Sequence, residues 1–138
     1  VAHGVIDTDL DGSLADRLVE IDTELERVIR EHAPDVGAVE TIFFSKNANS
    51  AAKLGHARGV ILLRLARAGM PIHEYAPALV KRSVAGKGAA DKKQVAMVMT
   101  AILRLAAPPR SDAADALAVA LTHLHAANFQ SMIAAAKR

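Results

Sequence analysis

The amino-acid sequence predicts an α/β fold, in which helices cover a mixed sheet. Short apolar runs alternate along the chain with longer segments of helical periodicity, and this alternation is typical of α/β proteins. Glycines, prolines and helix-capping residues separate the segments and support the same division. With 138 residues, of which 51% are hydrophobic, the chain is long enough for one domain, residues 1–138, with its own core.

The first forty residues predict a strand end, a helix and a buried strand. Residues 1–6 resemble the tail of a strand that enters a loop. Ser13 is a favourable cap for a helix over residues 14–32, whose apolar residues recur on one stripe: Leu14, Leu18, Ile21, Leu25, Val28 and Ile29. Residues 36–39 form an apolar run of the buried-strand type, and Glu40 stands at its C-terminal end.

The remaining residues predict four helices and one more strand. Gly69 ends a helix over residues 51–68, and residues 70–75 read as a strand. The later helices are expected at residues 77–84, 91–105 and 111 to about 125, the last with an alanine-rich tail that extends it. The flexible loop Gly86-Lys87-Gly88 does not have the spacing of a phosphate-binding P-loop.

Composition excludes several classes of protein. The chain contains no cysteine, so it has no disulfide framework, thiol nucleophile or cysteine-based zinc site, and this agrees with a reducing cytoplasmic setting. No apolar run is long enough to span a bilayer, so we expect no membrane partner. The six histidines are scattered and are expected to be structural or exposed rather than a ligand set.

A net charge of +2 conceals a strong asymmetry along the chain. Residues 1–40 contain eleven Asp and Glu but only three Arg, whereas residues 41–110 contain twelve Lys and Arg against two acids. Such a basic segment is either an ordinary solvated surface or the electrostatic footprint of a polyanionic partner.

Asp112 and Asp115 open the last predicted helix, three residues apart and therefore on one face. Two carboxylates at this spacing can share a hard cation such as Mg²⁺, with Mn²⁺ as the alternative. They can equally complement the helix dipole as capping residues. Glu40 is a third candidate, because ligand sites in α/β sheets gather at the carboxyl ends of strands; its alternative is a solvated strand end.

Two further features are ambiguous. Phe43 lies three residues after Glu40, where it can be a core residue or can wedge against a DNA base. Lys92 stands near a predicted helix start, where it can bind phosphate or remain a solvated charge.

Three blocks of sequence resemble the RuvC family of Holliday-junction resolvases, in family order and at family spacing. They are Ala38-Val39-Glu40-Thr41-Ile42-Phe43-Phe44-Ser45-Lys46-Asn47-Ala48-Asn49-Ser50 with Lys53-Leu54-Gly55-His56-Ala57-Arg58-Gly59-Val60; Tyr75-Ala76-Pro77 with Val80-Lys81 and Val84-Ala85-Gly86-Lys87-Gly88-Ala89-Ala90-Asp91-Lys92; and Asp112-Ala113-Ala114-Asp115-Ala116-Leu117-Ala118 with Thr122-His123.

The resemblance implies an RNase H-like α/β fold, a homodimer, and magnesium-dependent symmetric nicking of four-way junction DNA in concert with RuvA and RuvB. By family match, Glu40, Asp112 and Asp115 are catalytic, metal-binding acids. The residues assigned to DNA by the same resemblance are Phe43, Lys46, Arg58, Lys81 and Lys92. Residues 51–68 match the helix region that helps to build the family's dimer interface.

The family's first strand carries a fourth catalytic aspartate in a Gly-Ile-Asp-Pro-Gly-like segment, and no residues here match it. Asp7, Asp9 and Asp11 lie in the loop beyond that strand and are not its counterparts. The chain also begins at Val1 without an initiator methionine. We therefore expect either that residues upstream of Val1 are missing or that the chain is an inactive, junction-binding remnant.

Overall fold

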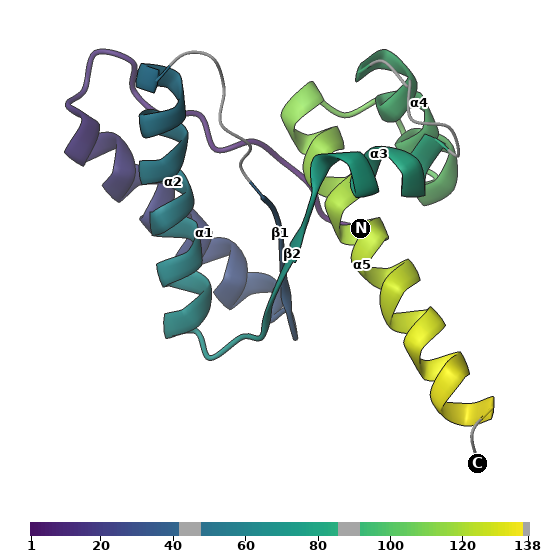
Figure 1. Cartoon of the computed structure of the whole chain (residues 1–138). Coiled ribbons are helices and arrows are strands. Elements are labelled where there is room, and N and C mark those ends of the chain that lie inside the picture. Colours follow the sequence, from purple (N-terminus) through teal and green to yellow (C-terminus); the bar gives the residue numbers. More distant parts are fainter. Residues whose placement is uncertain (42–47, 86–91, 137–138) are drawn as a thin grey trace. The chain divides into compact units, whose positions relative to one another are not determined.

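The computed structural model describes residues 1–41, 48–85 and 92–136 and contains five helices and two strands within them (Figure 1). In chain order the elements are α1 (Leu14–His32), β1 (Gly37–Glu40), α2 (Ala48–Arg67), β2 (Ile72–Tyr75), α3 (Pro77–Ala85), α4 (Lys92–Leu103) and α5 (Ser111–Ala136). Each was predicted within a few residues of its ends, and the predicted extension of α5 by its alanine-rich tail is confirmed. None of the helices described here is long and apolar enough to cross a membrane.

The strand predicted at residues 1–6 is wrong. Residues 1–9 have no regular secondary structure. A strand requires ladder hydrogen bonds to a neighbouring strand, and the sheet in the described part of the chain consists of β1 and β2 alone. An apolar segment that has no neighbouring strand to pair with does not form a strand.

α1 begins and ends at the residues that its caps dictate. The Ser13 hydroxyl oxygen accepts a hydrogen bond from the Asp16 amide at 3.2 Å and satisfies one of the free N–H groups of the first turn. At the other end Ala33 adopts a left-handed conformation, φ 42°, and its amide donates to the Ile29 carbonyl at 2.8 Å. Asp16 in the first turn and Arg30 in the last complement the helix dipole.

β1 and β2 pair in parallel. The Gly37 amide donates to the Pro71 carbonyl at 2.9 Å and the Thr41 amide to the Tyr75 carbonyl at 2.8 Å, so in both bonds the acceptor lies 34 residues after the donor. In a parallel ladder this register sets Tyr75 opposite Glu40, with both side chains on one face of the sheet.

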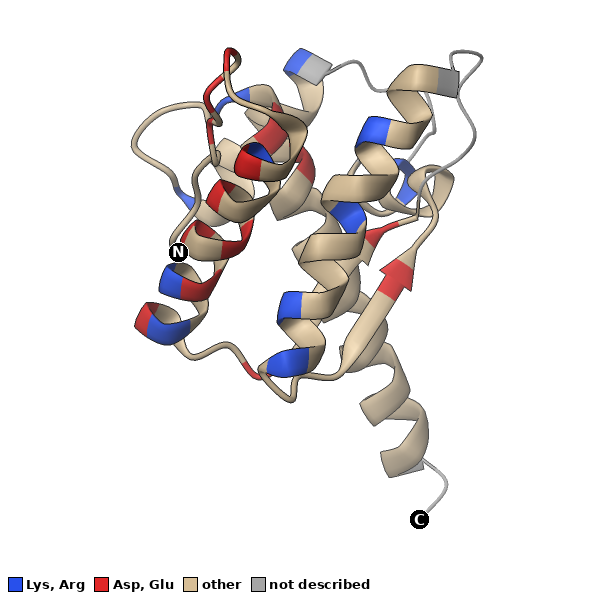
Figure 2. Cartoon of the chain, turned by 90° about the vertical axis from the view of Figure 1, so that its left-hand side faces the viewer, with Lys and Arg blue, Asp and Glu red and all other residues tan. Residues whose placement is uncertain are grey.

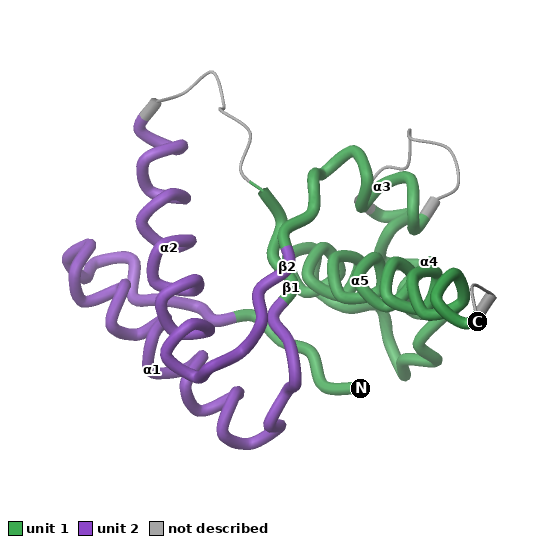
Figure 3. The backbone as a smooth tube through the Cα atoms, turned by 60° about the horizontal axis from the view of Figure 1, so that its bottom comes forward, with its two compact units in different colours: residues 1–5, 38–41, 74–138 green, residues 6–37, 42–73 purple. Residues whose placement is uncertain are grey.

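The chain divides into two compact units, drawn in different colours in Figure 3. Unit 1 comprises residues 1–5, 38–41 and 74–138, and unit 2 comprises residues 6–37 and 42–73.

Unit 1 is built around an apolar core between α3, α4 and α5. Met99 is completely buried at its centre. The other buried members are Val80, Val95, Ala114, Leu117, Ala118, Val119 and Leu121. Ala38 of β1 and Tyr75 of β2 pack against this cluster, so one face of the strand ends belongs to the same core.

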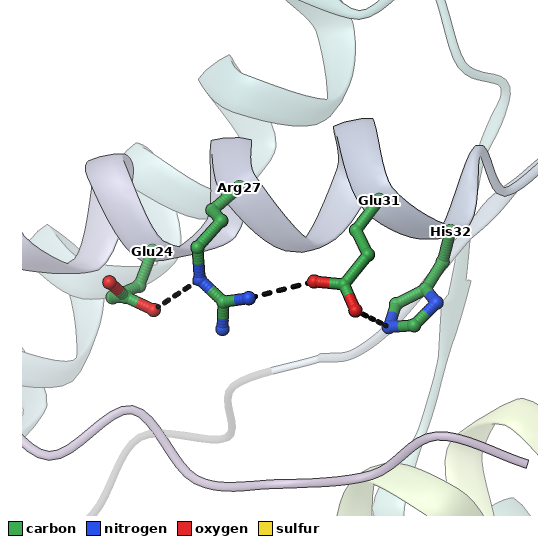
Figure 4. Close-up of polar contacts among 4 residues, drawn as sticks. All are labelled: Glu24, Arg27, Glu31 and His32. Carbon is green, nitrogen blue, oxygen red and sulfur yellow. Dashed lines mark hydrogen bonds and ion pairs between the residues drawn. The ribbon is translucent and has the colours of Figure 1, made fainter.

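Unit 2 holds α1 against α2 through charges. Arg64 of α2 donates to both carboxylate oxygens of Asp22 on α1, with 2.7 Å between Nε and Oδ1, and its Nη1 lies 3.1 Å from Glu26 Oε1. The Arg64 guanidinium lowers the pKa of Asp22 by hydrogen bonding and charge. Farther along α1, Arg27 bridges Glu24 and Glu31 on the exposed surface (Figure 4).

Candidate active site

Two carboxylates of unit 1, Glu40 and Asp115, interact across elements far apart in the sequence. Glu40 is the last residue of β1, and Asp115 lies in the second turn of α5. Partial burial raises the pKa of Glu40 above its ordinary value of 4.5, and the Asp115 charge raises it further. The carboxylate retains solvent contact, because Glu40 as a residue is exposed. The two acids therefore repel each other in a setting that solvates them incompletely.

The alanine-rich face of α5 explains this approach. Ala113, Ala114 and Ala118 are 2%, 1% and 2% exposed, so α5 presents small side chains to the core where larger ones would hold the strands away. Ala38 packs against that core, and side chains two residues apart on a strand share a face. Glu40 consequently leaves β1 on the side of the sheet that faces α5.

Lys81 of α3 is a cation that acts on Glu40. Its charge lowers the pKa of Glu40, opposing burial and Asp115, although these two raise it more. α3 is fixed against α5 by Val80, which is 6% exposed, and by a 2.8 Å hydrogen bond between the Ser83 and Thr122 hydroxyls. An exposed lysine whose charge acts on Glu40 is suited to bind a phosphate that approaches this carboxylate.

Asp112 is placed differently from the other two predicted acids. It is exposed in the first turn of α5, where its charge complements the helix dipole. Among the residues that the structure describes, no three His, Asp or Glu side chains are grouped closely enough to hold a metal ion. The structure thus brings Glu40 and Asp115 together and leaves Asp112 one turn away.

The pair nevertheless has the chemistry of a cation site. Carboxylate oxygens are the ligands that hard divalent cations prefer, and a magnesium site commonly uses one or two carboxylates and completes its shell with water and substrate phosphate. A cation between Glu40 and Asp115 would remove their repulsion. The residues present therefore fit a divalent metal ion.

The predicted DNA-binding residues are only partly described. Phe43 and Lys46 lie outside the described residues, as does the loop Gly86-Lys87-Gly88, and of Lys92 only the backbone position at the start of α4 is described. Arg58 is half-buried on α2, in unit 2. Lys81 is the predicted DNA contact that the structure places beside the acids.

One pairing at this site was not predicted from the sequence. The Tyr75 hydroxyl and Nδ1 of His123 are 2.8 Å apart, and the two rings meet edge to face. His123 had been expected to be a structural or surface histidine. The sequence offered one hint of this pairing, since both residues belong to blocks of the family resemblance. That they are in contact follows only from how β2 packs against α5.

Comparisons with known proteins agree with this fold. The family model "Crossover junction endodeoxyribonuclease RuvC" matches residues 1–123. Curated relatives of that name are 71% identical in Sorangium cellulosum, over 98% of this chain and 75% of the relative, and 47% identical in Parvibaculum lavamentivorans, over 99% and 78%.

The solved structures give the same result. The T. thermophilus RuvC in complex with a Holliday junction substrate matches with a TM-score of 0.86 and 36% identity, over 94% of this chain and 79% of that chain. A second structure of Thermus thermophilus RuvC matches with a TM-score of 0.82 over the same shares. These likenesses confirm the predicted RNase H-like α/β fold class. The chain belongs to the RuvC family of crossover junction endodeoxyribonucleases.

Proposed function

We propose that this protein resolves four-way DNA junctions by magnesium-dependent hydrolysis of phosphodiester bonds. The observation that carries the proposal is the Glu40–Asp115 pair, a carboxylate at the end of β1 and one on α5 that repel each other, in a family of junction nucleases. When bound, Mg²⁺, or Mn²⁺ as the alternative, would activate water and neutralise charge on the scissile phosphate. This DNA is also the substrate of the T. thermophilus relative.

In this proposal the acidic residues bind the cation and the basic residues bind the DNA phosphates. Glu40 and Asp115 would hold the cation, and Asp112, one turn earlier on α5, would complete the acidic set. Lys81 holds the phosphate next to the acids and offsets the negative charge that develops on it. Phe43, Lys46, Arg58 and Lys92 extend the contact along the DNA within the basic segment 41–110.

We further propose a homodimer that forms through α2. The Leu63 side chain, one turn after Gly59 on the same face of this helix, is 50% exposed. A Cβ atom added at Gly55 or Gly59 would meet nothing within 4 Å, so packing within the chain does not explain these helix-weakening glycines. A second α2 lying against them would. Two sites related by a two-fold axis suit a two-fold symmetric junction.

The cellular setting follows from the substrate. A junction nuclease of this family acts with the branch-migration proteins RuvA and RuvB on cytoplasmic DNA, and we propose both proteins as partners. The chain as a whole, residues 1–138, is proposed to act as one nuclease domain.

A second candidate function is junction binding without cleavage. It is favoured by the grouping of only two of the three predicted acids in the described structure. It predicts salt-dependent affinity for four-way junctions but no product in any divalent metal.

A four-way junction with one labelled strand at a time separates the two functions. In Mg²⁺ we expect paired nicks at symmetric positions, and in Asp115→Asn a rate lower by about a thousandfold, the equivalent of roughly 4 kcal/mol of transition-state stabilisation. Junction affinity in Ca²⁺ should change little. Glu74→Gln is the matched control, since this exposed acid lies next to Tyr75 but on the other face of β2. Tight binding without cutting by the parent protein would reject nuclease activity in favour of the second candidate.

A further inference from the structure

A tyrosine of unit 1 connects the strand that carries Glu40 to the helix that carries Asp115. The Tyr75 carbonyl accepts two hydrogen bonds from Thr41, one from its amide at 2.8 Å and one from its hydroxyl at 3.3 Å. Thr41 follows Glu40 directly, so these bonds fix the backbone on the C-terminal side of that carboxylate.

The side chain of the same tyrosine reaches α5. Its hydroxyl is 2.8 Å from Nδ1 of His123, and its ring packs against the apolar core of unit 1. Either partner can donate in this bond, depending on the histidine tautomer. Because Tyr75 lies opposite Glu40 and on the same face of the sheet, the two side chains extend toward α5 side by side.

The residues that interact with Glu40 and Tyr75 lie on the same helix. Asp115 and His123 are eight residues apart in α5, about 12 Å along the helix axis. Tyr75 therefore contacts α5 about two turns after Asp115, the residue whose charge acts on Glu40. The strand end can neither slide along α5 nor lift away from it without breaking the Tyr75–His123 bond.

We infer that Tyr75 and His123 are positioning residues that set the separation of the Glu40 and Asp115 carboxylates for a shared divalent cation. This inference rests on the proposed function, because it assumes that the two acids hold the cation. Neither residue needs to touch the metal or the DNA. The bond acts as outer-shell partners of metal ligands do, by holding ligands at a separation that a cation can bridge.

Metal binding without DNA tests the inference. Binding of Mn²⁺ alone, followed by the electron paramagnetic resonance of the free ion, should weaken about tenfold in Tyr75→Phe, the lower end of the effect of outer-shell substitutions. His123→Leu should weaken it similarly. The double variant should be no weaker than either single one, since both remove the same bond.

Ser83→Ala is the matched control. It also removes a 2.8 Å hydrogen bond to α5, at Thr122, the residue next to His123, but it leaves β1 and β2 untouched. We expect its Mn²⁺ affinity to stay within twofold of the parent. An equal loss in Ser83→Ala would show general loosening of α5 and overturn the positioning role.

Amide hydrogen exchange at Thr41 in metal-free protein is the second measurement. It should accelerate in Tyr75→Phe, because the strand end is then held at one point fewer. Both readouts must change; an effect on only one, or on neither, contradicts the inference. Unchanged Mn²⁺ affinity in both Glu40→Gln and Asp115→Asn would instead refute the cation site itself, and the inference with it.

Discussion

Unit 1 and unit 2 use charge in opposite ways. In unit 2 four acids of α1 pair with arginines, and Arg64 lowers the pKa of one of them, Asp22. In unit 1 an apolar core holds Glu40 and Asp115 together although they repel each other, and the pKa of Glu40 rises. Paired charges connect helices, whereas the maintained repulsion is the feature on which the proposed cation site rests. The direction in which the pKa of a carboxylate shifts in this protein therefore depends on the charges of its neighbours.

Colouring by charge makes the same contrast visible along the chain (Figure 2). α1 bears closely spaced acidic and basic residues, while the C-terminal part of α5, which leads to the marked C-terminus, bears neither. Among the hydrophobic residues described as buried, Leu65 alone belongs to unit 2. Unit 1 is thus stabilised mainly by its core, and unit 2 depends more on its ion pairs.

Removal of the central core side chain should have the largest effect on stability. Met99→Ala empties a completely buried position between α4 and α5, and such substitutions cost about 2–5 kcal/mol. Urea unfolding should show this loss. The exposed Met97→Ala is the matched control, at 67% exposure, and should change stability by less than about 0.5 kcal/mol. Equal effects of the two variants would contradict a core centred on Met99.

A smaller loss is expected where β1 approaches α2 in unit 2. A Cβ atom at Gly37 would lie 2.7 Å from Leu65 Cδ1, so the buried Leu65 side chain or the strand would have to shift. Gly37→Ala should therefore cost about 1–3 kcal/mol through overpacking. Leu65→Ala removes the clashing atoms, so the double variant should lose less than the sum of the single losses in a double-mutant cycle. Additive losses would show that the clash is relieved elsewhere.

The stability contributions of Glu40 in unit 1 and Asp22 in unit 2 should change with pH in opposite directions, each by a modest amount. Glu40 has a raised pKa in the folded state, so its contribution to stability is greatest below about 4.5 and is lost as pH rises through the raised pKa. Asp22 has a lowered pKa, so its contribution is complete above its ordinary value of 3.8 and is lost as pH falls through the lowered pKa.

Metal-free urea unfolding across pH 3–7 measures both effects. Asp115→Asn should reduce the loss of stability on the alkaline side, because it removes a charge that raises the pKa of Glu40. Asp22→Asn should reduce the loss on the acid side. If both variants changed the pH dependence of the unfolding free energy in the same direction, the pKa values of Glu40 and Asp22 would not be shifted in opposite directions.

Local signals in the sequence predicted most of the fold. The apolar stripe and Ser13 cap determined α1, and Gly69, with φ 71°, ends α2 as predicted. The prediction for residues 1–6 was wrong because a strand depends on a partner that local sequence does not specify. The Tyr75–His123 bond joins residues 48 apart and depends on sheet register and helix packing, neither of which a sequence motif contains.

The candidate site was only partly predictable for the same reason. Residue type and family spacing selected Glu40, Asp112 and Asp115, but spacing on one helix cannot determine which aspartate approaches the strand. The buried alanine face of α5 determines it, with Ala114 and Ala118 turned to the core and Asp115 beside them. Asp112, one turn earlier, remains exposed.

The proposed cation site at Glu40 and Asp115 is tested most directly by the free energy of unfolding as a function of Mg²⁺ concentration. A cation bound only by the folded state stabilises it by about 0.4 kcal/mol when its concentration equals Kd, and by about 2.7 kcal/mol at a hundredfold excess. The parent protein should follow this curve, as should Asp22→Asn, which removes an acid from unit 2. Asp115→Asn should show almost no dependence on Mg²⁺. If it gains as much stability as the parent, the carboxylate pair is not the cation site.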